Sequence, residues 1–512
     1  MARGADFYLQ DHKVSAGVGR LALRAGLVSV ASGYGNAALQ IIAAIVLARL
    51  LTPGDFGIVA IITALTTCAP FLIDFGLTDA TIQRASITQE QASAVFWISC
   101  ALGLAVAASL VACSGLIASL YHEPRLRSVA MWSAATFVLS GMSGQHLSLL
   151  RRALQFTTIA KIQFLGALVG MGVALLLAID GAGYWALVLR PIANASFVMV
   201  GAWSLCSWRP GFPVFDGEVK SMVRFGMHVV GFSVVYSISR AADRLALGLL
   251  YSPKTVGYYQ NAVTLYDNSI FLALAQLHNV GSAALSKLQS SPTALIQKYE
   301  AALSMVAFFA MPAAATLSIT ARDVVGIVLG EKWQPAGALL AIFALRGIFQ
   351  AVEGSQGWLH LSLGRADRWK NWGVINAVVQ VVAIFCGLRF GATGVAIAMV
   401  VASALVACPS ISYAGRPVGI GTALVIRATG RQFIGAIVCA AAGWLVQSVM
   451  LQHVSSITRI LVSACFSNVI YLFIVVGLLR LTEPLVVMGR FVRQQLPPCA
   501  ITRPIPTFRI WR

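Results

Sequence analysis

Charged side chains inside long apolar stretches are the residues of this sequence that could do chemistry. Arg240, Asp243 and Arg244 fall within about 100° of one face of a helix with 3.6 residues per turn. A charge at the centre of a bilayer costs roughly 2.5–3.5 kcal/mol on insertion scales, so such residues generally face a cavity or a partner. Guanidinium groups also pair bidentately with phosphate. The pattern predicts a water-filled, net cationic cleft that binds an anionic group.

The candidate residues divide by charge. The candidates for substrate binding in the cationic cleft are Arg190, Arg240, Arg244 and Arg346. The candidates for proton or cation coupling, or for ion pairs, are Asp74, Asp243, Asp267 and Glu353. Structural ion pairing alone, for example between Arg240 and Asp243, is the alternative that the sequence leaves open.

The composition requires a membrane scaffold for these residues. Of the 512 residues 58% are hydrophobic and only 11% are charged, whereas about a quarter of the residues of a soluble domain are charged. A hydrocarbon core about 30 Å thick needs roughly 20 apolar residues per helix, and the chain supplies such stretches from end to end. Runs such as IIAAIVLARLL are apolar all round, which excludes a transmembrane β-barrel with alternating strands.

We therefore predict an all-α polytopic membrane protein with about fourteen transmembrane helices. Helices are required because backbone groups in lipid must be satisfied within the segment. They are expected at about 26–50, 57–78, 92–120, 128–148, 162–180, 183–205, 226–250, 259–284, 302–321, 335–358, 371–388, 392–413, 432–451 and 458–479.

The distribution of Lys and Arg over the loops predicts the orientation. With the amino terminus in the cytoplasm, about three times as many of the 37 Lys and Arg residues fall on the inner side as on the outer side. Both termini are then cytoplasmic. The net charge of +19 follows from this orientation, so membrane lipid is an expected partner and nucleic acid is not.

An internal repeat runs through the sequence at offsets between 200 and 213 residues. The matched segments are LLTPGDFG (50–57) with LYSPKTVG (250–257), RALQF (152–156) with RADRW (365–369), and GAG (181–183) with GATG (391–394). Six helices separate the copies, so both halves share one orientation, as in the parallel repeats of some transporters. Two six-helix bundles around a central cleft follow.

The repeat and the loops divide the chain into six parts. They are a basic cytoplasmic amino terminus (1–25), an amino-terminal six-helix bundle (26–205), a cytoplasmic linker (206–225), a carboxy-terminal six-helix bundle (226–414), helices 13 and 14 (415–480) and a basic cytoplasmic tail (481–512). No metal or cofactor is expected, because the nine cysteines stand singly without a C-x-x-C pair. No G-x-x-x-x-G-K-[ST] motif is present, so the chain carries no ATPase of its own.

Several motifs together resemble a known family. They are LARLLTPGDFGIVA (47–60), Phe225-Gly226 with Asp243 further along the same helix, SPKTVGYYQNA (252–262) and LGEKWQPAG (329–337). Over nearly the whole chain the sequence resembles the polysaccharide transporter branch (Wzx-type flippases) of the multidrug/oligosaccharidyl-lipid/polysaccharide superfamily.

The resemblance implies two six-helix lobes around a V-shaped cleft in the bacterial inner membrane, and no enzyme activity. The implied substrate is an undecaprenyl-pyrophosphate-linked oligosaccharide, moved to the periplasmic leaflet by alternating access for lipopolysaccharide or exopolysaccharide biosynthesis. Family members are thought to bind pyrophosphate in a cationic lumen, which agrees with the arginine set. A polysaccharide polymerase and export machinery are possible further partners.

Three alternatives remain from the sequence. A drug/cation antiporter of the same fold would favour an acidic cavity, whereas here arginines match or outnumber acids in each half. A membrane polysaccharide polymerase or glycosyltransferase would need a long loop or domain outside the membrane, and no outer loop much exceeds about a dozen residues. A purely structural scaffold would leave the repeated lobes with buried charges unexplained.

Overall fold

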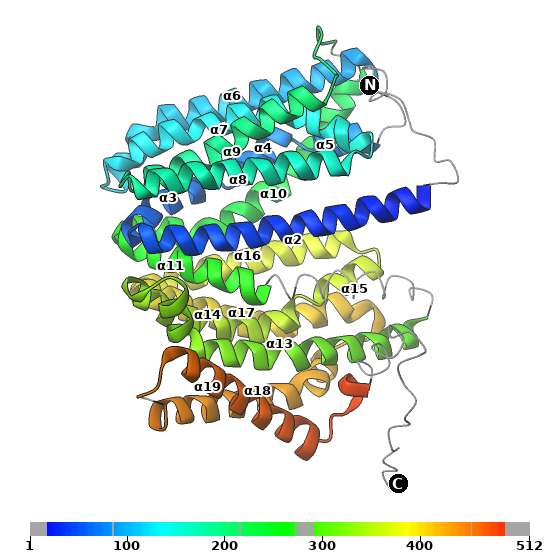
Figure 1. The fold of residues 1–512 in the computed structure, drawn as a ribbon. Coiled ribbons are helices and arrows are strands. Elements are labelled where there is room, and N and C mark those ends of the chain that lie inside the picture. Colours follow the sequence, from blue (N-terminus) through cyan, green and yellow to red (C-terminus); the bar gives the residue numbers. More distant parts are fainter. Residues whose placement is uncertain are drawn as a thin grey trace. The chain divides into compact units, whose positions relative to one another are not determined.

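The described parts of the chain are helical in a computed structural model (Figure 1). The structure describes residues 18–83, 87–214, 217–271, 274, 285, 291–451 and 453–486. The predicted all-α class is confirmed. Most of the predicted amino-terminal segment, much of the second half of the eighth helix and most of the basic tail lie outside the described residues.

The helices have the following bounds. In chain order they are α2 (Val18–Leu50), α3 (Pro53–Leu65), α4 (Ala69–Asp74), α5 (Leu77–Gln83), α6 (Gln89–Leu120), α7 (Arg125–Arg152), α8 (Phe156–Ile179), α9 (Trp185–Leu205), α10 (Gly217–Leu250), α11 (Pro253–Tyr266), α13 (Pro292–Val328), α14 (Gln334–Glu353), α15 (Gln356–Ser362), α16 (Ala366–Leu388), α17 (Gly391–Gly415), α18 (Thr422–Val449) and α19 (Ser456–Leu472). Short turns of 3-10 or π helix follow α11, α13, α17 and α19.

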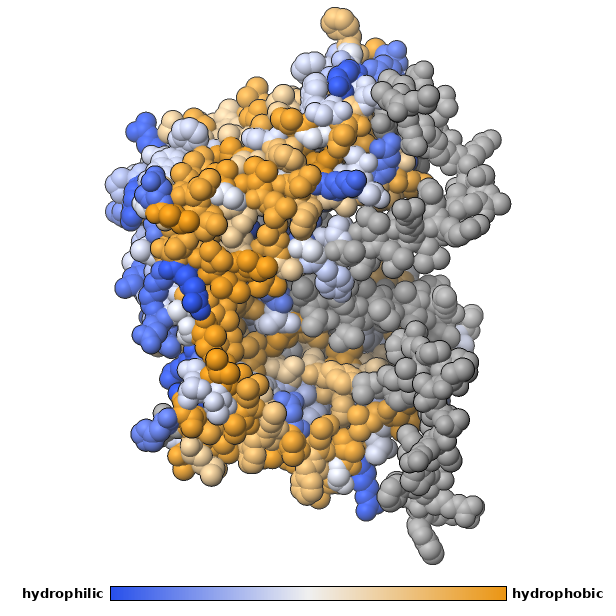
Figure 2. All heavy atoms as spheres, in the orientation of Figure 1, coloured by the Kyte–Doolittle hydropathy of each residue, from blue (hydrophilic) through white to orange (hydrophobic). Residues whose placement is uncertain are grey.

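The chain is a multi-pass membrane protein. Within the described residues, eleven helical stretches are long and apolar enough to cross a membrane. Large apolar side chains point outward from them, and Leu116, Leu176 and Phe385 are 65–70% exposed. Figure 2 shows hydrophobic residues over the middle of α8. Helices α7 and α10 have spanning lengths of 28 and 34 residues but are more polar, so the count of fourteen stays a prediction.

The chain forms two compact units, each assembled from separate stretches. The first unit holds the residues up to Ser269 together with Ala321–Phe343 and Lys370–Ser403. The second unit holds Ile270–Thr320, Ala344–Trp369 and the residues from Ala404 onward. Helices α13, α14, α16 and α17 therefore contribute to both units, and the division into six-helix bundles at 26–205 and 226–414 stays a prediction.

The second predicted helix, expected at 57–78, is broken into α3, α4 and α5. Pro70 lies in the first turn of α4 and has no amide hydrogen with which to continue the bonding from α3. At the other end of α4, Phe75 (φ 48°) and Gly76 (φ 66°) adopt left-handed backbone conformations. Pro70 alone was not a sufficient signal for this break, since Pro191, Pro312 and Pro409 lie inside α9, α13 and α17 without ending them.

The two copies of the repeat begin a helix in the same way. Thr52 and Ser252 are the N-cap residues of α3 and α11, both with extended backbone (ψ 157° and 152°), and each is followed by proline. Proline suits this position because the first amides of a helix have no intrahelical acceptor. Thr52 also forms a capping box with Asp55. The matching local structure at an offset of 200 supports the repeat.

The two copies meet at a pair of glycines. A Cβ atom on Gly57 would lie 1.7 Å from the carbonyl oxygen of Pro253, and one on Gly257 would lie 1.8 Å from that of Pro53. Real Cβ atoms essentially never come closer than 3.0 Å to such an atom, so α3 and α11 can cross with their backbones in contact only because both positions are glycine. The contact is reciprocal, with each glycine facing the proline of the other copy.

The turns before α8 and α16 also match, but at an offset of 210 rather than the 213 that pairs RALQF with RADRW. Leu154 between α7 and α8 (φ 54°) and Gly364 between α15 and α16 (φ 64°) are both left-handed. The next residue in each turn, Gln155 or Arg365, donates its amide hydrogen to the carbonyl five residues earlier at 2.9 Å. Both helices thus end in the same hydrogen-bonded cap, which satisfies carbonyls left open by the helix.

Arg49 and the segment after α13 cap the ends of each other's helices. The Arg49 guanidinium donates to the last two carbonyls of α13, with 3.3 Å from Nε to the Val328 oxygen. In return, Lys332 Nζ lies 2.8 and 2.7 Å from two carbonyl oxygens at the end of α2, and Trp333 Nε1 lies 2.8 Å from a third. The last carbonyls of a helix have no intrahelical donor and carry partial negative charge, so both ends are stabilised.

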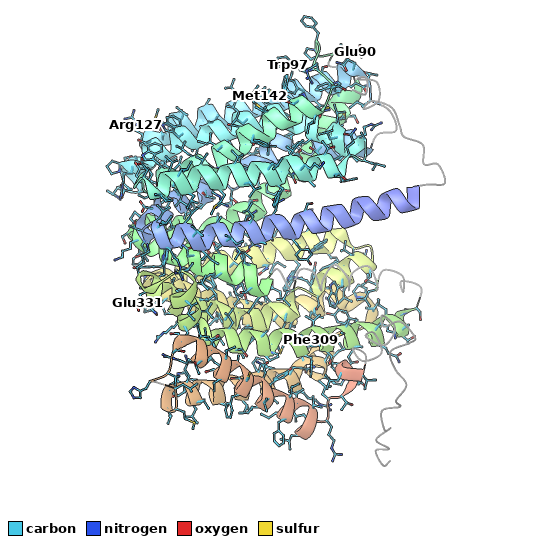
Figure 3. All side chains as sticks on the ribbon, in the orientation of Figure 1. Glu90, Trp97, Arg127, Met142, Phe309 and Glu331 are labelled. Atoms are coloured by element: carbon cyan, nitrogen blue, oxygen red, sulfur yellow. The ribbon has the colours of Figure 1, made fainter. Side chains whose placement is uncertain are left out.

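Trp333 joins three of the motifs that carry the family resemblance. Its buried ring lies edge-on to Phe56 (5.2 Å between centroids) and to Tyr258 (6.0 Å). LARLLTPGDFGIVA, SPKTVGYYQNA and LGEKWQPAG therefore converge at one end of the first unit. Figure 3 places Glu331, next to this cluster, at the same end as Arg127 and opposite Glu90.

Replacing Gly57 with alanine is expected to push α3 and α11 apart, because the new methyl group would overlap the Pro253 carbonyl. Overpacking of this kind costs about 1–3 kcal/mol, so purified Gly57→Ala should unfold at a lower temperature than the parent at the same heating rate. Gly54→Ala is the matched control, because a Cβ atom there meets only the Thr52 hydroxyl oxygen at 3.8 Å. Equal unfolding midpoints for the two variants would contradict the close contact.

Candidate functional site

Two neighbouring helices gather half of the charged residues predicted for the cleft. Arg240, Asp243 and Arg244 lie on α10, and Asp267 opens the π-helical turn that follows α11. Single π turns within helices often occur at functional sites. The structure thus brings these residues into one cluster, here called the arginine cluster, within the first unit.

Arg244 is held by three acceptors. Its Nε lies 3.2 Å from Asp243 Oδ1 and its Nη1 lies 3.2 Å from Gln260 Oε1, while Nη2 donates to the Arg240 carbonyl. The side chain is 19% exposed. Because Gln260 belongs to α11, these bonds tie α10 to α11, and Arg244 serves chiefly to position its neighbours.

Asp243 is a buried carboxylate with a full set of donors. It is 5% exposed and accepts hydrogen bonds from the Tyr259 hydroxyl (2.9 Å) and from the backbone amide of Arg244 (2.8 Å), besides the Arg244 guanidinium. A buried charge is tolerated only when it is paired and hydrogen-bonded. Tyr259 is itself fully buried against the ring of Phe343 at 5.2 Å, so the carboxylate is fixed in place.

Arg240 is the accessible cation of the arginine cluster. Its side chain is 44% exposed, its Nη2 lies 3.8 Å from Asp267 Oδ2, and its Nη1 lies 3.4 Å from the Tyr236 hydroxyl. An ion pair this long and this exposed contributes little stability. From the sequence, an ion pair between Arg240 and Asp243 was left open. In the structure Arg240 instead pairs with Asp267, and Arg244 pairs with Asp243.

The remaining candidates lie outside the arginine cluster. Arg190 is partly buried on α9 in the first unit, and among the described residues no acceptor lies within hydrogen-bonding distance of its guanidinium. Arg346 and Glu353 lie on the part of α14 that belongs to the second unit, and both take part in polar or electrostatic interactions. Glu353 is buried, with 8% exposure.

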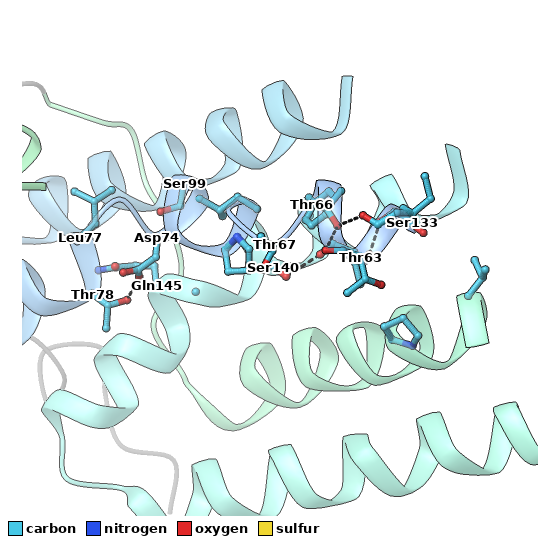
Figure 4. Close-up of a pocket in the computed structure, with 18 of the residues that line it drawn as sticks. Thr63, Thr66, Thr67, Asp74, Leu77, Thr78, Ser99, Ser133, Ser140 and Gln145 are labelled. Carbon is cyan, nitrogen blue, oxygen red and sulfur yellow. Dashed lines mark hydrogen bonds between the residues drawn. The ribbon is translucent and has the colours of Figure 1, made fainter. Parts of the chain in front are cut away.

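Asp74 lines a pocket of about 500 Å³ in the first unit, between α3, α4, α5, α6, α7 and α9 (Figure 4). Its carboxylate accepts a hydrogen bond from the Thr78 hydroxyl, which lies 2.9 Å from the hydroxyl oxygen of Ser148. We call this pocket the hydroxyl pocket. Figure 4 shows Asp74, Thr78 and Gln145 at one end of it and Thr63 toward the other. The sequence predicted Asp74 as a candidate but did not predict the pocket.

A polar stripe along α7 was the overlooked signal for the hydroxyl pocket. The stripe consists of Ser133, Thr136, Ser140, Gly144 and Ser148, each three or four residues after the last and all lining the pocket. Small glycines bring α6 and α7 together beside it, since a Cβ atom on Gly141 would lie 2.6 Å from the Ser99 carbonyl oxygen. An apolar helix would have no reason to carry such a stripe toward its neighbours.

Comparison with known sequences gives a family match and named relatives. Residues 46–338, more than half of the chain, match the family model described as polysaccharide biosynthesis protein. The lipopolysaccharide biosynthesis protein WzxC of Escherichia coli (strain K12) is 24% identical over 357 residues, covering 68% of this chain and 72% of that protein. The amylovoran biosynthesis protein AmsL of Erwinia amylovora is 22% identical over 307 residues, covering 59% and 79%.

Comparison with solved structures identifies the fold. The lipid II flippase MurJ in an inward closed conformation superposes with a TM-score of 0.70 at 13% sequence identity, covering 89% of this chain and 99% of that one. At this identity the likeness concerns the fold alone. It agrees with the all-α architecture expected from the family resemblance.

Removing the Tyr259 hydroxyl is expected to destabilise the arginine cluster, because Asp243 would lose a buried donor. Hydrogen bonds to charged groups contribute about 1.5–3 kcal/mol, so Tyr259→Phe should lower the midpoint of thermal unfolding. Tyr258→Phe is the matched control, since the Tyr258 hydroxyl has no hydrogen-bond partner in the described part of the chain. Equal effects of the two substitutions would argue against the bond to Asp243.

Proposed function

This chain belongs to the polysaccharide biosynthesis protein family, and we propose that it is a flippase for undecaprenyl-pyrophosphate-linked oligosaccharides in the bacterial inner membrane. The observation that carries the proposal is the family match over residues 46–338. Its relatives are named for lipopolysaccharide and amylovoran biosynthesis. The unit would move from the cytoplasmic to the periplasmic leaflet and serve the synthesis of a surface polysaccharide.

The arginine cluster supports an anionic head group as the substrate. A guanidinium with 44% of its side chain exposed and an acid partner at 3.8 Å, as at Arg240, suits a diphosphate, because planar N–H donors match phosphate oxygens in pairs. Arg244 would keep α10 and α11 in register, so that Arg240 is held in position to bind the diphosphate. Arg190 and Arg346 are assigned as further cations of the substrate path.

We assign an alternating-access cycle to two six-helix lobes, residues 26–205 and 226–414. The diphosphate and sugars would enter a cleft open to the cytoplasm while the polyprenyl tail remains in lipid. With both termini in the cytoplasm, the end that carries Arg49 and Trp333 would face the periplasm. The chain itself performs no bond-breaking step in this proposal, and a polymerase and export machinery would take over the flipped unit.

Replacing Arg240, Arg244 and Arg346 together with alanine is expected to abolish polysaccharide output. The reason is the loss of the Arg240 and Arg346 donors that would compensate diphosphate in a low-dielectric cleft, together with the Arg244 bonds that tie α10 to α11. Output is measured in a deletion strain that carries the variant on a plasmid, and the amount of protein in the membrane is measured in parallel by immunoblot.

The control for this variant is Arg389→Ala, which removes an exposed arginine just after α16 and should leave output unchanged. Normal output from the triple variant would refute the assignment of the arginines. A deletion strain that keeps its polysaccharide and becomes susceptible to cationic drugs would instead indicate a drug/cation antiporter.

A further inference from the structure

The hydroxyl pocket around Asp74 presents mainly hydrogen-bond acceptors. Thr63 and Ser140 donate their hydroxyl hydrogens to helix carbonyls four residues earlier, at 2.8 and 2.7 Å, and Thr66 and Thr136 also donate to carbonyls of their own helices. Each hydroxyl oxygen then offers its lone pairs to the pocket. A ligand with many O–H or N–H donors fits such a lining.

Gln145 is the strongest sign of a ligand in the hydroxyl pocket. Its side chain is 2% exposed and lines the pocket, and neither its amide nitrogen nor its amide oxygen has a hydrogen-bond partner among the described residues. A buried polar group without a partner costs about 1–3 kcal/mol. A group that both accepts and donates hydrogen bonds would satisfy this amide.

The charge of the hydroxyl pocket separates it from the arginine cluster. Asp74 is the one charged side chain among the described residues that line it, and the lining includes no Lys, Arg or His. A phosphate or carboxylate would be repelled by this carboxylate and would find no cation to pair with. The pocket is therefore unsuited to the diphosphate of the substrate.

The size and the apolar walls of the hydroxyl pocket favour an organic ligand over a bare ion. Its volume of about 500 Å³ falls within the range of roughly 300–1,000 Å³ that is usual for small-molecule pockets. Ile62, Ile73, Phe137 and Leu187 line it between the polar groups. A sugar ring has apolar C–H faces and a rim of hydroxyl groups, and so matches both kinds of lining.

We propose that the hydroxyl pocket binds a neutral or amino sugar residue of the transported oligosaccharide. This inference rests on the proposed flippase function and adds a sugar site to it. Gln145 and Asp74 recognise the O–H and N–H groups at one end, and the α3 and α7 hydroxyls accept from the ring at the other. Uronic acids are disfavoured by Asp74.

The test measures binding of two methyl glycosides to the purified chain in lipid nanodiscs by saturation-transfer NMR. Methyl N-acetylglucosaminide is expected to receive saturation, and methyl glucuronide is expected to bind at least tenfold more weakly. Gln145→Leu and Ser140→Ala should each weaken binding of the first glycoside, by at least tenfold for Gln145→Leu. Inorganic pyrophosphate binding, followed by ³¹P NMR, should be unchanged in both variants.

Ser109→Ala is the matched control for Ser140→Ala. Both serines are exposed and donate to the carbonyl four residues earlier, at 2.8 and 2.7 Å, but Ser109 does not line the hydroxyl pocket. Because Ser140→Ala removes only an exposed hydroxyl, it keeps the test valid should Gln145→Leu fold poorly. Unaltered glycoside binding in Ser140→Ala and Gln145→Leu would overturn the sugar site.

Two further outcomes would overturn the sugar site. One is the absence of saturation transfer to methyl N-acetylglucosaminide with the parent chain. The other is stabilisation by sodium chloride alone that is lost in Asp74→Asn, which would identify a cation site. If the purified chain binds the sugar but deletion of its gene leaves polysaccharide output intact, the flippase function is refuted and the sugar site is not. The two failures are therefore distinguishable.

Discussion

The crossing of α3 and α11 is the constraint on which the first unit depends. Backbone contact at Gly57 and Gly257 fixes where α11 begins relative to α3. Because α11 starts there, Gln260 reaches Arg244 and Tyr259 reaches Asp243. A buried carboxylate without these donors would be strongly destabilising, so the geometry of the arginine cluster depends on two positions that have no side chain.

Two regions of the first unit differ in the ligands they suit. The arginine cluster exposes a guanidinium at Arg240, whereas the hydroxyl pocket offers oxygen acceptors, one carboxylate at Asp74 and the unpartnered amide of Gln145. The first favours an anion, and the second favours a ligand with many hydroxyl groups. A molecule that carries diphosphate at one point and sugars beyond it would need both chemistries, which is the substrate class proposed for this chain.

Much of the fold could be predicted from the sequence because apolar length and loop charge act locally. The helix positions and the repeat around Pro53 and Pro253 follow from such local patterns, and so does the shared face of Arg240, Asp243 and Arg244. The partners of these charges could not be predicted, since pairing depends on how α10 and α11 rotate against each other. The hydroxyl pocket could not be predicted from any one serine of α7, because single serines are common in helices. Only the spacing of these serines shows that they share one polar face of the helix.

The exchange of caps between α2 and α13 has an evolutionary consequence. Arg49 donates hydrogen bonds to carbonyls near residue 328, and Lys332 donates to carbonyls near residue 50, although about 280 residues separate the two segments. Because the acceptors are backbone carbonyls, they remain whatever side chains their own segment carries, and only loss of a donor side chain leaves them unsatisfied. Each basic residue can therefore be lost or kept independently of the other as family members diverge, whereas the residues that supply only carbonyls are free to change type.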